Sequence, residues 1–113
     1  MNEIETKLVH KKCIPCEAGG PALNRIEATV LLKQVTEWHL NEGARKLGRT
    51  FRFKDFKEAM AFADKVGDIA EEEGHHPDLY IAWGKVKIEL STHAVKGLSQ
   101  NDFIMAAKID QIS

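Results

Sequence analysis

Hydrophobic residues recur at intervals of three and four positions in three segments of the chain, and this spacing predicts three helices. Each segment follows a residue that favours the position before a helix, and an acidic residue stands three positions later, as in a capping box. The first helix should end near Thr36, and the second should end in a left-handed turn at Gly74. The three capping pairs are Asn24 with Glu27, Asp55 with Glu58, and Ser99 with Asp102.

Each predicted helix has an apolar side that should face a common core. The second helix carries the longest apolar stripe. The inward positions are Ile26, Val30, Leu31 and Val35 in the first helix, Phe56, Ala59, Met60, Ala63, Val66 and Ala70 in the second, and Phe103, Ala106 and Ala107 in the third.

Shorter segments alternate between apolar and polar residues, which is typical of β-strands. Gly84 and Lys85 fit the two-residue turn of a hairpin between the last two of these segments. In the second segment Arg49 breaks the alternation, because it falls on the side of Leu47 and Phe51. The four predicted strands are residues 38–41, 45–53, 79–83 and 86–91.

The elements follow one another as helix, two strands, helix, two strands, helix. Hairpins without long crossovers indicate an α+β fold, in which a four-stranded antiparallel sheet has its helices packed on one face. Residues 1–22 contain several turn formers and should be a flexible leader, followed by a single domain over residues 23–113. Because the edge strands and the second face of the sheet need cover, we expect a homodimer or tetramer.

The composition agrees with one globular domain and excludes several functions. The chain has 113 residues, of which 43% are hydrophobic and 29% charged. A net charge of −1 offers no basic surface for direct binding to nucleic acid or to a membrane. No apolar run approaches a membrane span, and the first residues lack the apolar stretch of a secretory signal. With two cysteines only, the chain is expected to be cytoplasmic.

Three of the five histidines should meet in one pocket. His75 and His76 follow the end of the second helix, and His93 follows the last strand, so the hairpin between them returns His93 to the pair. Imidazoles suit proton transfer near neutral pH, and Glu71 and Asp102 are close enough in sequence to orient them. Unremarkable surface histidines are one alternative. A zinc site is another, although adjacent histidines tend to point apart and the usual zinc spacings are absent.

A second group of metal-binding residue types lies in the leader. His10, Cys13 and Cys16 form an H-x2-C-x2-C pattern, which could be half of a zinc site or a redox pair. No second cysteine pair completes four ligands within one chain, and no βαβ unit supports a thioredoxin-like role. We therefore predict no metal and leave this pattern without a function.

The histidine region resembles the core signature of the pterin-4a-carbinolamine dehydratases. The likeness extends over roughly residues 23–112, with Trp38 and residues 51–56 contributing upstream. Gly74, Val95 and Asn101 depart from the residues that animal relatives tend to have at these positions, and they leave the three imidazoles intact. The matching elements are Glu71, His75-His76-Pro77, Trp83, Ser91-Thr92-His93, Gly97-Leu98-Ser99 and Asp102.

The resemblance implies dehydration of a 4a-hydroxytetrahydropterin to the quinonoid dihydropterin and water, which recycles the pterin cofactor of aromatic amino-acid hydroxylases. It implies no metal or organic cofactor. His75 and His93 would be the proton-transfer pair and His76 would bind and orient the pterin, whereas Glu71 would steer an imidazole. Asp102 would set the last helix or contact the substrate.

Three further residues are expected to bind or orient the substrate by the same resemblance, namely Pro77, Trp38 and Thr92. The resemblance also leaves a rival function. Some animal relatives bind a homeodomain transcription factor, and distant relatives help to assemble a carbon-fixing enzyme. A non-catalytic binding or assembly module is therefore the alternative to the enzyme.

Overall fold

Three helices and four strands form in the predicted order, and they confirm the α+β fold. The computed structural model describes residues 7–13 and 21–113. Two short 3-10 helices, η2 and η3, are added to the predicted elements. In chain order the elements are η2 (Leu8–His10), α1 (Arg25–Leu32), β1 (His39–Leu40), β2 (Leu47–Arg52), α2 (Phe56–Glu73), β3 (Asp78–Ala82), β4 (Lys85–Leu90), η3 (His93–Val95) and α3 (Gln100–Ile112).

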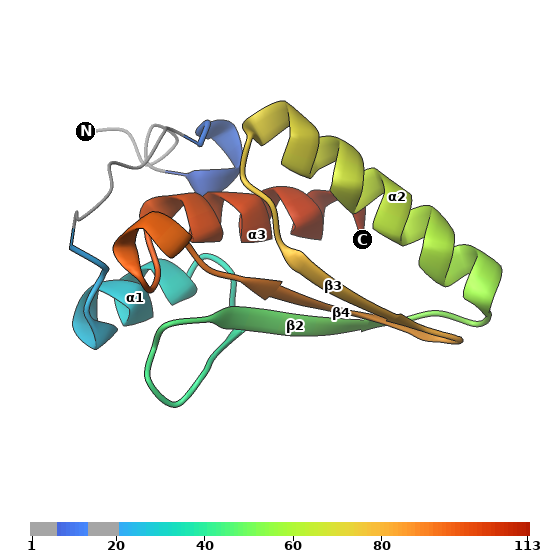
Figure 1. Cartoon of the computed structure of the whole chain (residues 1–113), viewed down its shortest axis with the longest axis horizontal. Coiled ribbons are helices and arrows are strands. Elements are labelled where there is room, and N and C mark those ends of the chain that lie inside the picture. The colour runs from blue at the N-terminus through green and yellow to red at the C-terminus, as the bar shows by residue number, and fades with distance from the viewer. Residues whose placement is uncertain (1–6, 14–20) are drawn as a thin grey trace.

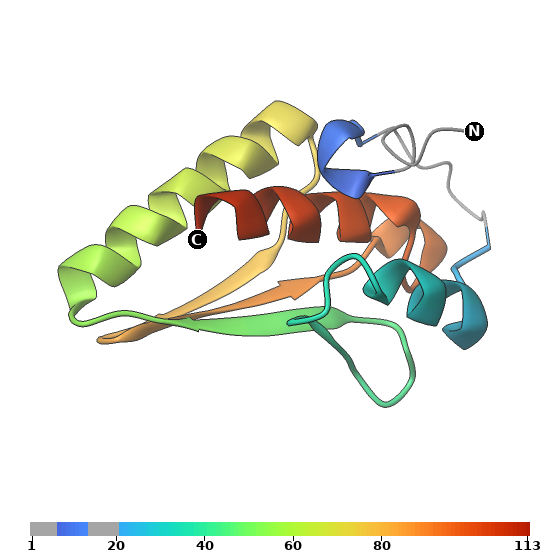
Figure 2. The same cartoon turned by 180° about the vertical axis from the view of Figure 1, so that it is seen from behind.

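The sheet is antiparallel throughout, with the strand order β1-β2-β4-β3. Figures 1 and 2 show α2 and α3 side by side on one face of the sheet, while α1 lies at the end where α3 begins. The core fills the space between this face and the two helices. Among the described residues, no helix is both long and apolar enough to cross a membrane. The largest fully buried side chains include Trp38, Leu47, Val66, Val86, Ile88, Leu90, Phe103, Met105 and Ile109.

The capping residues act as the sequence predicts. Asn24 and Glu27 form a reciprocal capping box, and Ser99 and Asp102 form another. The Asp55 side chain accepts a hydrogen bond from the backbone at the third residue of α2. Gly74 ends α2 with a φ of 66°, a left-handed conformation that costs glycine little.

Two apolar stripes are only partly buried. In α1 the buried residue is Ala28, whereas Ile26 and Val30 are exposed, because this short helix touches the rest of the fold along one narrow side. In α2 the predicted alanines and Val66 are buried, but Phe56 and Met60 are exposed. The first turns of α2 extend beyond the end of α3, which therefore cannot cover them (Figures 1 and 2).

The hairpin turn lies one residue earlier than predicted. Ala82 pairs with Lys85, so the two turn residues are Trp83 and Gly84. The carbonyl of Gly84 accepts a hydrogen bond from the Phe53 backbone N–H at 2.8 Å. A Cβ at position 84 would lie 3.1 Å from the Phe53 carbonyl oxygen, so this close approach of two backbones favours glycine.

Arg49 lies on the core side of β2 and yet has polar partners. Its guanidinium binds Asp110 of α3 at 2.8 Å and stacks over the Phe51 ring, 4.3 Å from the ring centroid. The same Asp110 oxygen accepts a hydrogen bond from the buried Trp38 indole at 2.8 Å. One carboxylate thus ties β2 and the segment before β1 to α3, which explains why a charged residue interrupts the apolar pattern.

Trp38→Phe should lower the free energy of unfolding by about 1–2 kcal/mol, because the substitution removes a part-buried hydrogen bond and some core volume. Urea denaturation measures this loss. Trp83→Phe is the matched control, since the Trp83 side chain is 69% exposed, and it should change the stability little. Equal losses in the two variants would contradict this role of Asp110.

Candidate active site

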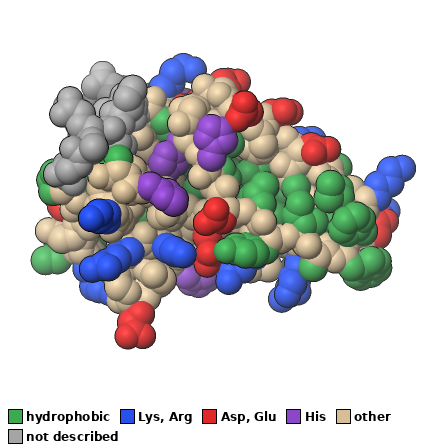
Figure 3. Space-filling model, in the orientation of Figure 1, with side chains coloured by type: hydrophobic (Ala, Val, Ile, Leu, Met, Phe, Trp, Pro, Cys, Tyr) green, Lys and Arg blue, Asp and Glu red, His purple; other side chains and the backbone are tan. Residues whose placement is uncertain are grey.

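Four segments meet at the end of the sheet opposite the hairpin turn. They are the C-terminal end of α2, the residues that enter β3, the residues that leave β4, and the N-terminal end of α3. Together they line a pocket of about 740 Å³, a size typical of small-molecule sites. His75, His76 and His93 all line this pocket, so the structure brings together the three histidines that the sequence singled out. Figure 3 shows histidine side chains gathered on this face.

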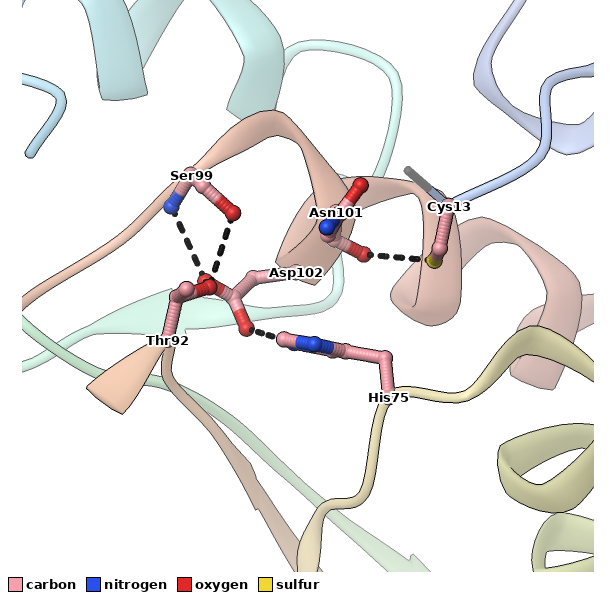
Figure 4. A network of polar contacts seen from close by, with 6 residues as sticks. All are labelled: Cys13, His75, Thr92, Ser99, Asn101 and Asp102. Atoms are coloured by element: carbon pink, nitrogen blue, oxygen red, sulfur yellow. Dashed lines mark hydrogen bonds and ion pairs between the residues drawn. The ribbon is translucent and has the colours of Figure 1, made fainter. Parts of the chain in front are cut away.

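Asp102 organises the centre of the site. Its carboxylate is fully buried, and its Oδ1 lies 2.7 Å from Nε2 of His75. Its Oδ2 accepts hydrogen bonds from the Thr92 hydroxyl at 2.8 Å and from the Ser99 backbone N–H at 3.0 Å. Figure 4 shows the His75 ring directed at this carboxylate. Both carboxylate oxygens are thus satisfied, which permits a buried acidic group here.

This arrangement favours one tautomer of His75. Because a carboxylate only accepts hydrogen bonds, Nε2 of His75 carries a proton and donates it to Asp102. Nδ1 is then the nitrogen that can exchange a proton with a bound molecule. The His75 side chain is 11% exposed, so it reaches the pocket from an almost buried position.

The other two histidines lie at the rim of the pocket. Nε2 of His76 lies 2.5 Å from Glu71, and both side chains are well exposed. Glu71 therefore orients His76 and makes no contact with His75. His93 is exposed in η3 and also lines the pocket.

The remaining predicted substrate-binding residues differ in their positions. Pro77 lines the pocket. Thr92 also lines it, but its hydroxyl donates a hydrogen bond to Asp102, so Thr92 helps to position the Asp102 carboxylate. Trp38 is 1% exposed, packs edge-on against Phe51 and lies outside the pocket lining. Its indole reaches Asp110 in the core, which removes it from the expected position as a pocket wall.

A family model described as pterin 4 alpha carbinolamine dehydratase matches residues 21–112. The chain belongs to this family.

Known members of the pterin-4a-carbinolamine dehydratase family span nearly the same length. A protein of Methylococcus capsulatus, provisionally named pterin-4-alpha-carbinolamine dehydratase, is 52% identical over 94% of this chain and 93% of its own. One of Chlorobium luteolum with the same provisional name is 50% identical over 89% of this chain and 90% of its own.

Solved structures agree on the fold. The crystal structure of a transcriptional coactivator/pterin dehydratase from Brucella melitensis superposes with a TM-score of 0.76, at 32% identity over 80% of this chain and 97% of that one. A pterin dehydratase-like protein described as a RuBisCO assembly factor gives a TM-score of 0.58, at 23% identity over 67% of this chain and 88% of that one. The latter likeness is one of fold alone.

In this member of the dehydratase family the leader contributes to the pocket, which sequence reasoning missed. Cys13 lines the pocket, its backbone N–H donates to Glu73 at 2.8 Å, and its thiol donates to the Asn101 carbonyl at 3.6 Å. Lys108 lies 3.7 Å from Glu73 and donates to the Val9 carbonyl. Leu8 is buried in the core, so residues 7–13 pack against α3. No sequence pattern links Cys13 to residues 60 and more positions away.

The Cys13 thiol stays protonated at neutral pH. Burial, reinforced by the nearby Glu73 carboxylate, raises the pKa of Cys13 from 9.0 to about 12. Redox cysteines and metal-binding cysteines have lowered pKa values instead. The described residues contain no group of three His, Cys, Asp or Glu side chains that could hold a metal ion. Cys16, the other half of the Cys-x-x-Cys pattern, lies outside the described residues.

In a Cys16→Ser variant, alkylation of Cys13 by iodoacetamide at pH 8 should be at least about a hundredfold slower than alkylation of a free cysteine peptide, because the thiolate is the reacting form. Alkylation in a denaturant gives the unprotected rate of the same chain. A native rate equal to the denatured rate would contradict the burial of this thiol.

Proposed function

We propose that the chain dehydrates 4a-hydroxytetrahydropterins to quinonoid dihydropterins and water, and so recycles the pterin cofactor of aromatic amino-acid hydroxylases. Membership of the dehydratase family supports the reaction class. The observation that carries the proposal is the pairing of His75 with the buried Asp102 in a pocket that also presents His76 and His93. Imidazoles held in this way can give and take protons near neutral pH.

The reaction breaks one C–O bond and makes one C=N bond. A general acid protonates the 4a-hydroxyl, which leaves as water with the electrons of the C4a–O bond. The N5 lone pair forms the double bond to C4a, and a general base takes the N5 proton. One proton enters and one leaves, so the protein is regenerated when the two groups exchange a proton through water.

His75 is suited to the role of base. When its Nδ1 takes the N5 proton, the ring becomes an imidazolium, and the Asp102 carboxylate 2.7 Å from Nε2 stabilises that charge. His93 is suited to the role of acid, because its exposed ring can regain a proton from water after each turnover. His76, oriented by Glu71, would bind the pterin at the rim.

The test uses the absorbance of the quinonoid dihydropterin after a 4a-hydroxytetrahydropterin is generated in the presence of the wild-type protein. We expect dehydration to be about 10²–10⁴-fold faster than in buffer, the contribution typical of general acid–base catalysis. A wild-type rate equal to the buffer rate would overturn the enzyme function. That result would favour the non-catalytic binding role instead. The Brucella melitensis protein, which shares this fold, is described as a transcriptional coactivator as well as a pterin dehydratase.

A further inference from the structure

A second, smaller pocket lies beside the histidine pocket. It has a volume of about 270 Å³. Residues 91–93 line both pockets and form the ridge between them. Three cationic residues also line the smaller pocket, namely Arg45, Lys46 and Lys96. His93 therefore stands between the proposed reaction centre and a group of positive charges.

The three cations have no acidic partner in the described part of the chain. Each is exposed, and none forms an ion pair with a carboxylate, whereas Arg49 and Lys108 do. Since the net charge of the chain is −1, this concentration of positive charge is local. Figure 3 shows Lys and Arg side chains gathered next to histidine on the face that carries the pocket.

The backbone that carries these cations is well fixed. The Asn41 side chain accepts hydrogen bonds from the backbone N–H groups of Arg45 at 2.7 Å and Lys46 at 3.0 Å. Lys96 closes η3 in a left-handed conformation, with its N–H bonded to the His93 carbonyl at 3.1 Å. The backbone is thus held at all three positions, and at Lys96 it is bonded directly to His93.

The opposite wall of the site is acidic. Asp78 lines the histidine pocket on the side of β3, and Glu71 is hydrogen-bonded to His76, whereas the Glu73 carboxylate, which also lines the pocket, is buried and paired with Lys108. An anionic group on a bound molecule would be repelled on that side and attracted on the side of Lys46 and Lys96. The charge pattern therefore selects one direction for such a group.

The structure of the pterin ring determines where such an anionic group would be attached. The reacting atoms are C4a and N5, and C6, which bears the side chain, is bonded to N5. With His75 acting at N5 and His93 at the hydroxyl of C4a, C6 is bonded to the atom that His75 serves. C6 lies two bonds from C4a, the carbon whose hydroxyl His93 serves, and His93 also lines the smaller pocket. We infer that the side chain occupies the pocket of Arg45, Lys46 and Lys96, and that the preferred substrates are pterins whose side chain carries a phosphate or a carboxylate. This inference rests on the proposed function, because that function places the reacting atoms.

The test compares three stable dihydropterins by equilibrium binding: 7,8-dihydrobiopterin with a neutral side chain, 7,8-dihydroneopterin triphosphate, and 7,8-dihydrofolate with carboxylates. We expect at least one anionic pterin to bind about tenfold or more tightly than dihydrobiopterin at 0.01 M salt, where the Debye length is about 30 Å. The preference should vanish near 1 M salt, where that length is about 3 Å.

A charge-removing variant assigns the preference to the pocket. In Lys46→Gln/Lys96→Asn the preference should fall to within about twofold, since each exposed cation near an anion contributes modestly. Asparagine tolerates the left-handed backbone at position 96, so the fold should persist. Lys57→Gln/Lys85→Gln removes the same charge at the far end of the sheet and should keep the full preference.

Several results would overturn the inference. One is equal binding of all three pterins, and another is a preference that survives in the Lys46 and Lys96 variant. Inorganic tripolyphosphate that binds as tightly as dihydroneopterin triphosphate would also do so, because the cations would then hold an anion without the ring. Dehydration and dihydrobiopterin binding without any anionic preference would refute this inference alone, whereas the absence of any pterin binding would refute the proposed function as well.

Discussion

Asp102→Asn should reduce the dehydration rate by about 10²–10⁴-fold while the protein remains folded. The asparagine oxygen can still accept from Thr92 and from the Ser99 backbone, so its NH₂ group must face His75. Nε2 of His75 then becomes an acceptor, and its proton moves to Nδ1, the nitrogen that should take the N5 proton. The measurement is kcat for quinonoid dihydropterin formation, with circular dichroism to verify the fold.

Asp110→Asn is the matched control for this prediction. Asp110 lies in the same helix and also accepts two side-chain hydrogen bonds, from Trp38 and Arg49, but it lies outside the histidine pocket. Its substitution should lower the stability and leave kcat near the wild-type value. If the Asp110 variant lost as much activity as the Asp102 variant, the effect of Asp102 would be one of general stability and the proposed positioning of His75 would fail.

His75→Ala and His93→Ala should each lower kcat by about 10²–10⁴-fold, because each removes one of the two proton-transfer groups. Their effects on stability should differ. His75→Ala leaves one buried oxygen of Asp102 without its partner and should cost about 1–3 kcal/mol of unfolding free energy. His93 is exposed, so its loss should cost little.

His39→Ala provides the reference for both histidine variants. His39 is exposed on β1 and does not line the histidine pocket, so its removal should change neither kcat nor stability. A loss of stability in His75→Ala with unchanged kcat would mean that His75 only fills the pocket floor. Unchanged kcat in His93→Ala would remove His93 from the role of acid.

The elements of the fold follow largely from local signals. Capping pairs such as Ser99 with Asp102 define helix starts through short-range hydrogen bonds, and these were predictable. The burial of individual positions was harder to predict, because it depends on what packs against each turn. Phe56 and Ile26 satisfy a helical apolar pattern and remain exposed, since no other element reaches them.

Part of the candidate site was likewise predictable from the sequence, and part was not. The hairpin between β3 and β4 made the meeting of His75 and His93 predictable, because antiparallel strands return the chain to its starting end. The positions of Trp38 and Cys13 were not predictable. Each depends on a partner far away in the sequence, Asp110 for the indole and Glu73 for the cysteine backbone.

The central claim is that the histidine pocket performs the dehydration. The most direct test is a stopped-flow measurement of quinonoid dihydropterin formation from 4a-hydroxytetrahydropterin by the wild type and by His75→Ala/His93→Ala. The account predicts rapid formation with the wild type and the buffer rate with the double variant. A double variant as fast as the wild type would contradict it.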